Sequence, residues 1–493
     1  MKILTFVFAC LLVFNSYGQE LSAKLKDAIK QDDVTALKKA LVGQDMNACY
    51  LSGKKSYTLL MLAIKIKQIH VVKYLAKKSA DIDQVCVDKT ALMYAVEADN
   101  LDCVRALVKA GADAKKEIKG WSAIDLAVAY KHTDIRNYFN GLGIYKNYQL
   151  NGADGPYVFD DVIYQVDHKS NLRMAKIDRS LPIHIQVANE AKDQFSINLR
   201  SNLREEPDTY PMPERLIAVS DIEGNFNGFY SFLLGNGIID EQYNWTFGKG
   251  HLVMVGDFFD RGENVTAILW LIYSLEAKAE AAGGKVHFIL GNHEVMNIQG
   301  DIRYVEEKYI AAAQKISEGK GIGEAYRYLY CAESELGQWL RTKNVMEKIG
   351  DHLFVHAGLH PDILNYDLSI NSVNRISREY IDFDLYRHPS DDSAANFLAG
   401  AKGPLWYRGL AAEPHHNGKV TITDLQKMLN YYQVKKVVIG HTLMRDVLTG
   451  YDGRVIKIDV KHGTEKNSGQ TKGLLVEDGI DYKVDDLGRR ELL

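Results

Sequence analysis

The sequence predicts a multidomain protein: an N-terminal all-α solenoid, a small β module and a larger α/β domain. Near the N-terminus, a six-residue phrase recurs at intervals of 32 residues, which is typical of stacked helical repeats. Apolar and polar residues then alternate over short runs, which predicts half-buried strands. In the last part, apolar runs of strand length end in residue types that bind metal ions. A chain of 493 residues has room for all three parts.

The composition is that of a folded protein without a nucleic-acid partner. Hydrophobic residues make up 46% of the chain and charged residues 25%, as in globular domains. The formal net charge is −4, and the charges are scattered rather than gathered in the basic stripe that nucleic-acid binding requires. We therefore expect no nucleic acid among the ligands.

Residues 1–18 have the pattern of a signal peptide. Lys2 precedes an almost wholly apolar run from Ile3 to Phe14, and Ser16-Tyr17-Gly18 offers small residues for cleavage before Gln19. The apolar run is short for a hydrocarbon core of about 30 Å, and no other stretch resembles a transmembrane segment. We expect export, either to the periplasm or out of the cell, with no stable membrane span.

Residues 19–145 contain four repeats. The recurring phrase places a small residue at equivalent positions: Ala63, Ala95 and Ala127, with Ala28 in a degenerate first repeat. The extra length of that first repeat falls around residues 51–55. The period and pattern resemble ankyrin repeats, in which a turn and two short helices form one unit. The solenoid would either bind a protein partner or serve as a stabilising segment, and the sequence favours neither.

The four cysteines that follow the signal peptide are Cys49, Cys86, Cys103 and Cys331. They are too few for a disulfide scaffold and form no C-x-x-C pattern. A bridge between Cys49 and Cys86 is one alternative, but the pattern favours buried free thiols.

Alternating apolar residues predict a small β module over residues 146–213. Examples are Tyr157/Phe159, Val162/Tyr164, Ile183/Ile185 and Phe195/Ile197. Such period-two runs read as short half-buried strands. No arrangement in this module predicts catalysis.

Five apolar runs in residues 214–493 lead into chemically active motifs. These motifs are Asp221-Ile222-Glu223-Gly224, Gly256-Asp257-Phe258-Phe259-Asp260-Arg261-Gly262, Gly291-Asn292-His293-Glu294, His356-Ala357-Gly358 and Gly440-His441-Thr442. Each motif alone is a weak signal. Buried strands hold the loops at their ends in place, so five such loops at one edge of a sheet can build one site.

In this order the motifs resemble those of the calcineurin-like metallophosphoesterases: D-x-H-G, G-D-x-x-D-R-G, G-N-H-E, H-A-G and G-H. Asp260-Arg261-Gly262 together with Glu294 resembles the phosphoprotein phosphatase branch. The stretch Gly403-Pro404-Leu405-Trp406-Tyr407-Arg408-Gly409 is similar to bacterial members. The resemblance implies an α/β metallophosphatase domain over residues 214–493, with a central β-sandwich flanked by helices.

The resemblance also implies a metal-dependent phosphoric ester hydrolase that binds two divalent ions. Asp257 would bridge the two ions. Asp221 and Glu223 would complete one metal site, and Asn292, His356 and His441 the other. Two ions about 3.5–4 Å apart make hydroxide available near neutral pH and hold a substrate oxygen.

The same resemblance assigns the remaining roles. The hydroxide would attack phosphorus in line while His293, positioned by Asp260, protonates the leaving oxygen as general acid. Arg261 and Arg408, with Asn292, would bind the phosphate, because planar guanidinium groups match its oxygens.

Glu223 departs from the family pattern, which has histidine at this position. A carboxylate is a harder ligand and favours Mn²⁺ or Mg²⁺ over Zn²⁺. We therefore predict an active site that prefers Mn²⁺, with Mg²⁺, Fe and Zn²⁺ as alternatives. A degenerate site that binds metal poorly is the other interpretation.

The stretch from residue 297 to 343 has helical spacing and follows the Gly-Asn-His-Glu motif directly. It would form either a cap over the metal site or a packing pair of helices.

The predicted function is hydrolysis of phosphomonoesters, foremost on Ser/Thr or Tyr of phosphoproteins. One alternative is a nucleotide or diadenosine tetraphosphate-type phosphohydrolase. A second alternative belongs to another class: a protein-binding ankyrin module on a degenerate phosphatase scaffold. The expected partners are a phosphorylated protein or small molecule and, on the ankyrin surface, another protein.

Overall fold

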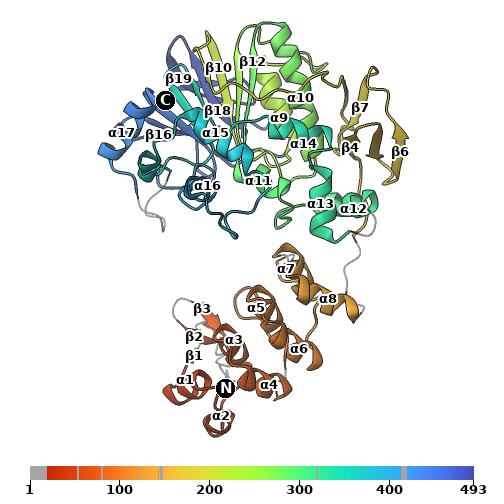
Figure 1. Ribbon diagram of the computed structural model, residues 1–493, viewed down its shortest axis with the longest axis vertical. Coiled ribbons are helices and arrows are strands. Elements are labelled where there is room, and N and C mark those ends of the chain that lie inside the picture. The colour runs from red at the N-terminus through yellow and green to blue at the C-terminus, as the bar shows by residue number, and fades with distance from the viewer. Residues whose placement is uncertain are drawn as a thin grey trace, which may run out of the picture. The chain divides into compact units, whose positions relative to one another are not determined.

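The computed structural model describes residues 19–52, 55–78, 81–119, 121–130, 132–142, 144, 148–317, 320–411 and 419–493. The chain divides into two compact units, residues 1–146 and 147–493 (Figure 1). The predicted signal peptide, residues 1–18, lies outside the described residues. Within the described ranges, no helix is long and apolar enough to cross a membrane.

The first unit consists of helix pairs, as the repeats predict. The pairs are α1 (Ala23–Lys30) with α2 (Val34–Ala40), α3 (Leu59–Lys65) with α4 (Ile69–Lys78), α5 (Ala91–Glu97) with α6 (Leu101–Lys109), and α7 (Ala123–Ala129) with α8 (Thr133–Gly141). Ser22, Thr58, Thr90 and Ser122 cap the first helix of each pair by accepting a backbone N–H. The repeat alanines are buried between neighbouring helices. The prediction of four ankyrin-type repeats is therefore confirmed.

The extra residues of the first repeat form a β-hairpin. Strands β2 (Tyr50–Ser52) and β3 (Lys55–Tyr57) pair antiparallel, and β1 (Gln19–Glu20) adds to β2. Cys49, next to this hairpin, forms a disulfide with Cys86 in the following repeat. The expectation of free thiols is therefore wrong for this pair, because the fold brings two cysteines that are 37 positions apart in sequence to a Cα–Cα distance of 5.9 Å. Cys103 and Cys331 are free.

The second unit begins with short strands and continues into two larger sheets. Strands β4 (Asp154–Phe159), β5 (Val162–Val166) and β6 (Leu172–Lys176) form one sheet, and β7 (Ile183–Gln186) pairs with β8 (Gln194–Ile197). This module packs on α10 (Val265–Ala281), where the indole N–H of Trp270 donates to the carbonyl of Pro156 (2.8 Å). The contact explains why α10 is buried along most of its length.

Two six-stranded mixed sheets form the centre of the second unit. One has the order β12 (Lys285–Ile289), β11 (His251–Val255), β10 (Arg215–Val219), β18 (Lys472–Glu477), β19 (Ile480–Asp485), β20 (Arg490–Leu492). The other has the order β16 (Leu448–Gly450), β17 (Val455–Lys457), β15 (Lys436–Ile439), β14 (His352–Val355), β13 (Met346–Ile349), β9 (Thr209–Tyr210). A core that includes Ala218, Val253, Phe354 and Val438 joins the two sheets. The predicted α/β sandwich is confirmed.

Helices surround the sandwich. Besides α10 they are α9 (Phe226–Gly235), α11 (Asn292–Ile298), α12 (Glu307–Ile316), α13 (Ile322–Leu329), α14 (Glu335–Arg341), α15 (Ile370–Glu379), α16 (Ser393–Ala399), α17 (Ile422–Tyr432) and the 3-10 helix Pro361–Tyr366. The segment after Gly-Asn-His-Glu forms α12, α13 and α14. Helices α12 and α13 pack on each other, α12 contacts β4 and α13 contacts α11. Of the two predicted alternatives, a cap over the metal site or a packing pair of helices, most of this segment therefore forms the packing pair.

Candidate active site

The five predicted strand ends meet at one edge of the two sheets. Strands β10, β11 and β12 run parallel, as do β14 and β15. Backbone hydrogen bonds then join the loops: Asp221 N–H donates to Gly256 (2.9 Å) and Gly440 N–H to His356 (2.8 Å). The sheets thus bring together residues that lie far apart in the sequence.

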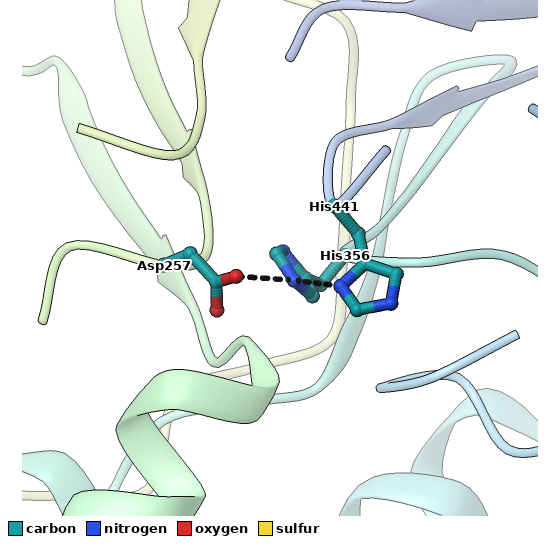
Figure 2. Close-up of side chains that lie close together, drawn as sticks. All are labelled: Asp257, His356 and His441. Atoms are coloured by element: carbon teal, nitrogen blue, oxygen red, sulfur yellow. Dashed lines mark hydrogen bonds and ion pairs between the residues drawn. The ribbon is translucent and has the colours of Figure 1, made fainter. Parts of the chain in front are cut away.

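Asp257, His356 and His441 form a buried cluster at this edge. Figure 2 shows the Asp257 carboxylate directed toward the two imidazole rings. Oδ2 of Asp257 lies 3.0 Å from Nε2 of His356, which is 3.2 Å from Nδ1 of His441. Oδ1 of Asn292 lies 3.1 Å from the same Nε2. The arrangement places one carboxylate, one amide oxygen and two imidazoles around a small volume.

Asp221 and Glu223, which were predicted to complete the other metal site, line the same pocket as Asp257. Asp221 is buried, and its carboxylate accepts the backbone N–H of His441 (3.0 Å). Glu223 is less buried and forms an ion pair with Arg261. Ligand-type atoms of Glu223, Asp257 and His293 lie within 4.8 Å of one another. The carboxylate that replaces the family histidine therefore still faces the cluster.

The site loops have left-handed backbone at residues other than glycine. Six such residues are Asp221 (φ 53°), Glu223 (48°), Asp257 (60°), Asp260 (71°), Arg261 (57°) and His441 (64°). This conformation costs about 1–2 kcal/mol per residue and is typical of functional sites. Glu294 offsets part of the cost: its buried carboxylate accepts four backbone N–H groups, from Gly291, Asp257, Phe258 and Phe259.

His293 is oriented by Asp260. Nδ1 of His293 lies 2.5 Å from Oδ2 of Asp260, and Nε2 faces Oδ2 of Asp257 at 3.8 Å. Burial lowers the pKa of His293, but the carboxylates of Asp257 and Asp260 outweigh it and raise the pKa above its ordinary value. The ring therefore keeps its proton more readily than a free histidine does.

The donor set fits a divalent cation. Nδ1 of His356 faces the carbonyl of Val255 (2.8 Å), which leaves Nε2 free for a metal. Burial lowers the pKa of His356, but Asp257 raises it to about 10, so positive charge is favoured at this point. Among the described residues, Nε2 of His441 is buried without a hydrogen-bond partner. Carboxylate, amide oxygen and imidazole are ligands for Mn²⁺, Fe and Zn²⁺ alike.

Comparison with known proteins decides the family. A model described as calcineurin-like phosphoesterase matches residues 214–445, and one for ankyrin repeats matches residues 25–118 and 86–149. The crystal structure of a cold-active protein-tyrosine phosphatase from a psychrophilic Shewanella species is 33% identical, with a TM-score of 0.61. That match covers 70% of this chain and 100% of the other. This chain belongs to the calcineurin-like phosphoesterases.

Within that family, the relatives are Shewanella-like protein phosphatases, a bacterial-type branch of the phosphoprotein phosphatases. Shewanella-like protein phosphatase 2 of Arabidopsis thaliana is 29% identical over 290 residues, covering 51% of this chain and 72% of the relative. Shewanella-like protein phosphatase 1 of Plasmodium berghei is 29% identical over 228 residues, covering 46% of this chain and 61% of the relative. The chain is a metal-dependent phosphatase with ankyrin repeats at its N-terminal side.

In this phosphoesterase, the two predicted phosphate-binding arginines line the same pocket as Asp257 and His441. Arg408 is half-buried and donates to the carbonyl of His441 (2.6 Å) and to Oγ1 of Thr442 (3.1 Å). Arg261 is more exposed and pairs with Glu223, while its guanidinium lies 5.2 Å from the ring of Tyr304. Arg408 is thus anchored to the protein, whereas Arg261 is held by one carboxylate and one aromatic ring.

The phosphoesterase pocket also contains residues that the motifs did not predict. Asp459 and His462, which follow β17, line it. Burial, together with nearby Asp257, raises the pKa of Asp459 to about 7. Next to the pocket, Asn297 contacts both Asp260 and His293, and Tyr326 donates a hydrogen bond to Asn297. The sequence signal that could have identified Asp459 is a carboxylate directly after an apolar residue at a strand end, Ile458-Asp459.

Proposed function

We propose that this chain is an exported, two-metal phosphoprotein phosphatase. The observation that carries the proposal is one pocket lined by Asp221, Glu223, Asp257, His293, His441 and two arginines. His356 contacts Asp257 and His441, Asn292 contacts His356, and Asp260 contacts His293. Each of these residue types serves hydrolysis of a phosphate ester, and no other described cluster combines them.

The protein's own groups act through identifiable atoms. Divalent ions, when bound, would supply the positive charge that makes water acidic enough to react near neutral pH. Asp260 holds Nδ1 of His293, so Nε2 faces the pocket and gives its proton to the leaving oxygen. Arg408, anchored at the carbonyl of His441, presents its guanidinium to the phosphate. Arg261 would exchange Glu223 for a phosphate oxygen when substrate enters.

A protein substrate is favoured over a small molecule by the surroundings of the pocket. A second hollow shares Asn225, Gly262 and Thr464 with the metal pocket and continues toward the β module. Its lining includes exposed Glu190 and Lys192. Such a groove has room for peptide on one side of the phosphorylated residue. The relatives named as protein phosphatases agree with this proposal, and the tyrosine phosphatase among them makes phosphotyrosine the first substrate to test.

Export is supported by two independent features. The first 18 residues have the pattern of a signal peptide. In addition, Cys49 and Cys86 form a disulfide, and disulfides are rare in reducing compartments. We propose a periplasmic or secreted location for these reasons.

Hydrolysis of an aryl phosphate by metal-stripped protein tests the proposal. Mn²⁺, Mg²⁺, Zn²⁺ or Fe²⁺ is then added back, and phosphotyrosine peptide, phosphoserine peptide and a nucleotide are compared. We expect turnover only with added metal, highest with Mn²⁺, and a loss of about 10²–10⁴-fold in His293→Asn. Turnover without metal, or an unchanged His293→Asn variant, would contradict the proposed site. No turnover with any metal would favour the binding-module alternative.

The ankyrin repeats are proposed to select a protein substrate or partner. Removal of residues 19–146 should leave aryl phosphate hydrolysis unchanged and lower activity on a phosphoprotein. Equal activity of the full and the shortened chain on phosphoproteins would show that the repeats do not select the substrate.

A further inference from the structure

The general-acid pair is itself held by two further buried residues. Asn297 lies one helical turn after His293 in α11, so both side chains are on the same face of the helix. Its Nδ2 donates to Oδ1 of Asp260 (2.9 Å) and to the backbone carbonyl of His293 (2.8 Å). Its Oδ1 accepts the hydroxyl of Tyr326, from α13, at 2.5 Å. Asn297 thus contacts both members of the pair.

The orientation of this amide is determined by its neighbours. Asn297 is 0% exposed and Tyr326 2% exposed, so water does not compete for their hydrogen bonds. Burial raises the pKa of Tyr326 well above its ordinary value, so the hydroxyl remains a donor. Rotating the amide by half a turn would place its oxygen against the carboxylate of Asp260 and the carbonyl of His293, and both hydrogen bonds from Nδ2 would be lost. An orphaned buried donor or acceptor costs about 1–3 kcal/mol.

Asn297 therefore fixes the direction in which His293 points. With Oδ1 bound by Asn297 and Oδ2 by His293, both oxygens of Asp260 are occupied and the carboxylate plane is set. The imidazole then has one orientation, with Nε2 toward the pocket. Without Asn297, the Asp260 carboxylate could turn about its broad terminal torsion, and the imidazole would follow it.

We propose that Asn297, held by Tyr326, is a positioning residue that aims the proton of His293 at the leaving oxygen of the substrate. The proposal rests on the proposed role of His293 as general acid. It also gives the helical segment after α11 a task in the reaction, because α13 reaches the general acid through Tyr326.

A positioning residue for the acid differs from a structural residue in one measurable way. Its loss should slow substrates whose leaving group needs a proton, and spare those whose leaving group departs as a stable anion. Phenyl phosphate belongs to the first class and 2,4-dinitrophenyl phosphate to the second. Both are small and aromatic, so the comparison does not depend on the natural substrate.

Asn374 in α15 is a matched control. It is 1% exposed, accepts the N–H groups of Val345 (2.9 Å) and Met346 (3.1 Å) through Oδ1, and donates to the Met346 carbonyl (2.8 Å). It therefore resembles Asn297 in type, burial and number of hydrogen bonds, but these bonds go to the backbone around β13. Asn374→Ala should destabilise the fold without touching the acid.

The experiment measures kcat with Mn²⁺ on both phosphates for the full-length wild type, Asn297→Ala, Tyr326→Phe, Asn374→Ala and His293→Asn. Asn297→Ala should lose about 10–100-fold on phenyl phosphate and less than about 3-fold on dinitrophenyl phosphate, since small misplacements of a catalytic group cost up to about 10²-fold. Tyr326→Phe should show the same selectivity with a smaller loss. Asn374→Ala should affect the two substrates equally.

Equal losses on both substrates in Asn297→Ala and Tyr326→Phe would overturn the proposal and leave a structural role. If Asn297→Ala does not fold, Tyr326→Phe decides by the same criterion. His293→Asn distinguishes the general-acid role of His293 from the positioning role of Asn297. Selectivity in His293→Asn without selectivity in the other two variants refutes the positioning role alone. If His293→Asn slows both substrates equally, both the general-acid role of His293 and the positioning role of Asn297 are refuted.

Discussion

The two units use the same uncommon backbone conformation for different purposes. In the repeats, Asp32 (φ 50°), Lys67 (59°) and Asp99 (48°) each stand two residues after the first helix of a pair. The N–H of the next residue bonds back to the carbonyl of a repeat alanine, for example Gln68 to Ala63 (2.9 Å). This is how a left-handed residue ends a helix. In the phosphatase, left-handed Asp257 and His441 instead end strands and face the metal pocket.

The difference lies in what the side chain does. At Lys67 the side chain is exposed, so the position needs only a backbone conformation that glycine also adopts. At Asp257 the side chain is 2% exposed and contacts His356, so both backbone and carboxylate are required. A left-handed residue of the repeats can therefore be replaced by glycine, whereas a left-handed residue of the phosphatase site is also needed for its side chain.

The largest expected effect comes from neutralising one buried carboxylate in each unit. Asp257→Asn should lower metal-dependent turnover by about 10³-fold or more, because metal ions supply several kcal/mol of transition-state stabilisation and each 1.36 kcal/mol is a factor of about ten. Asp125→Asn, in the capping box of α7, should leave aryl phosphate turnover unchanged. Steady-state kinetics on both variants checks this. Similar losses of turnover in Asp257→Asn and Asp125→Asn would contradict the different roles assigned to the two units.

Breaking the disulfide should affect the repeats alone. Replacing Cys49 and Cys86 by alanine opens a covalent loop whose ends are 37 positions apart, which should lower the stability of the first unit by about 3 kcal/mol. Hydrogen exchange of the full chain should show faster exchange in α1–α6 and unchanged exchange in β10–β12. An equal change in both regions, or lost aryl phosphate activity, would mean that the two units are energetically coupled.

Exchanging the unusual ligand should change metal preference rather than abolish activity. Glu223→His replaces a carboxylate by imidazole next to Asp257 and removes the partner of Arg261. We expect affinity for Zn²⁺ relative to Mn²⁺ to rise about tenfold, since imidazole suits Zn²⁺ better. Competitive metal binding measured by calorimetry gives the ratio. An unchanged ratio would show that residue 223 is not a ligand.

The smallest effect is expected at a left-handed residue of the repeats. Lys67→Gly should stabilise the first unit, by up to about 1 kcal/mol, because glycine adopts positive φ without the steric cost. Lys77→Gly, at an exposed site within α4, is the matched control and should destabilise by about 1 kcal/mol. Chemical unfolding monitored by hydrogen exchange compares them. A destabilised Lys67→Gly would mean that the lysine side chain matters at this turn.

Much of this molecule could be predicted from its sequence because the signals are local. The alanine period determines the helix pairs, and apolar strands ending in Asp257, His356 or His441 determine which loops meet. The Cys49–Cys86 bridge was only one of two alternatives in the sequence, since the choice depends on how residues 37 positions apart come together in the fold. Asn297 and Tyr326 were missed because neither stands directly after a predicted strand, and because their contact depends on how α13 packs against α11.

Locating the metals themselves tests the central claim most directly. Crystals grown with Mn²⁺ and measured at its absorption edge should show two anomalous peaks about 3.5–4 Å apart, with Asp257 between them. His356 and His441 should contact one peak, and Asp221 and Glu223 the other. A single peak, or no peak within coordination distance of Asp257, would contradict the two-metal site.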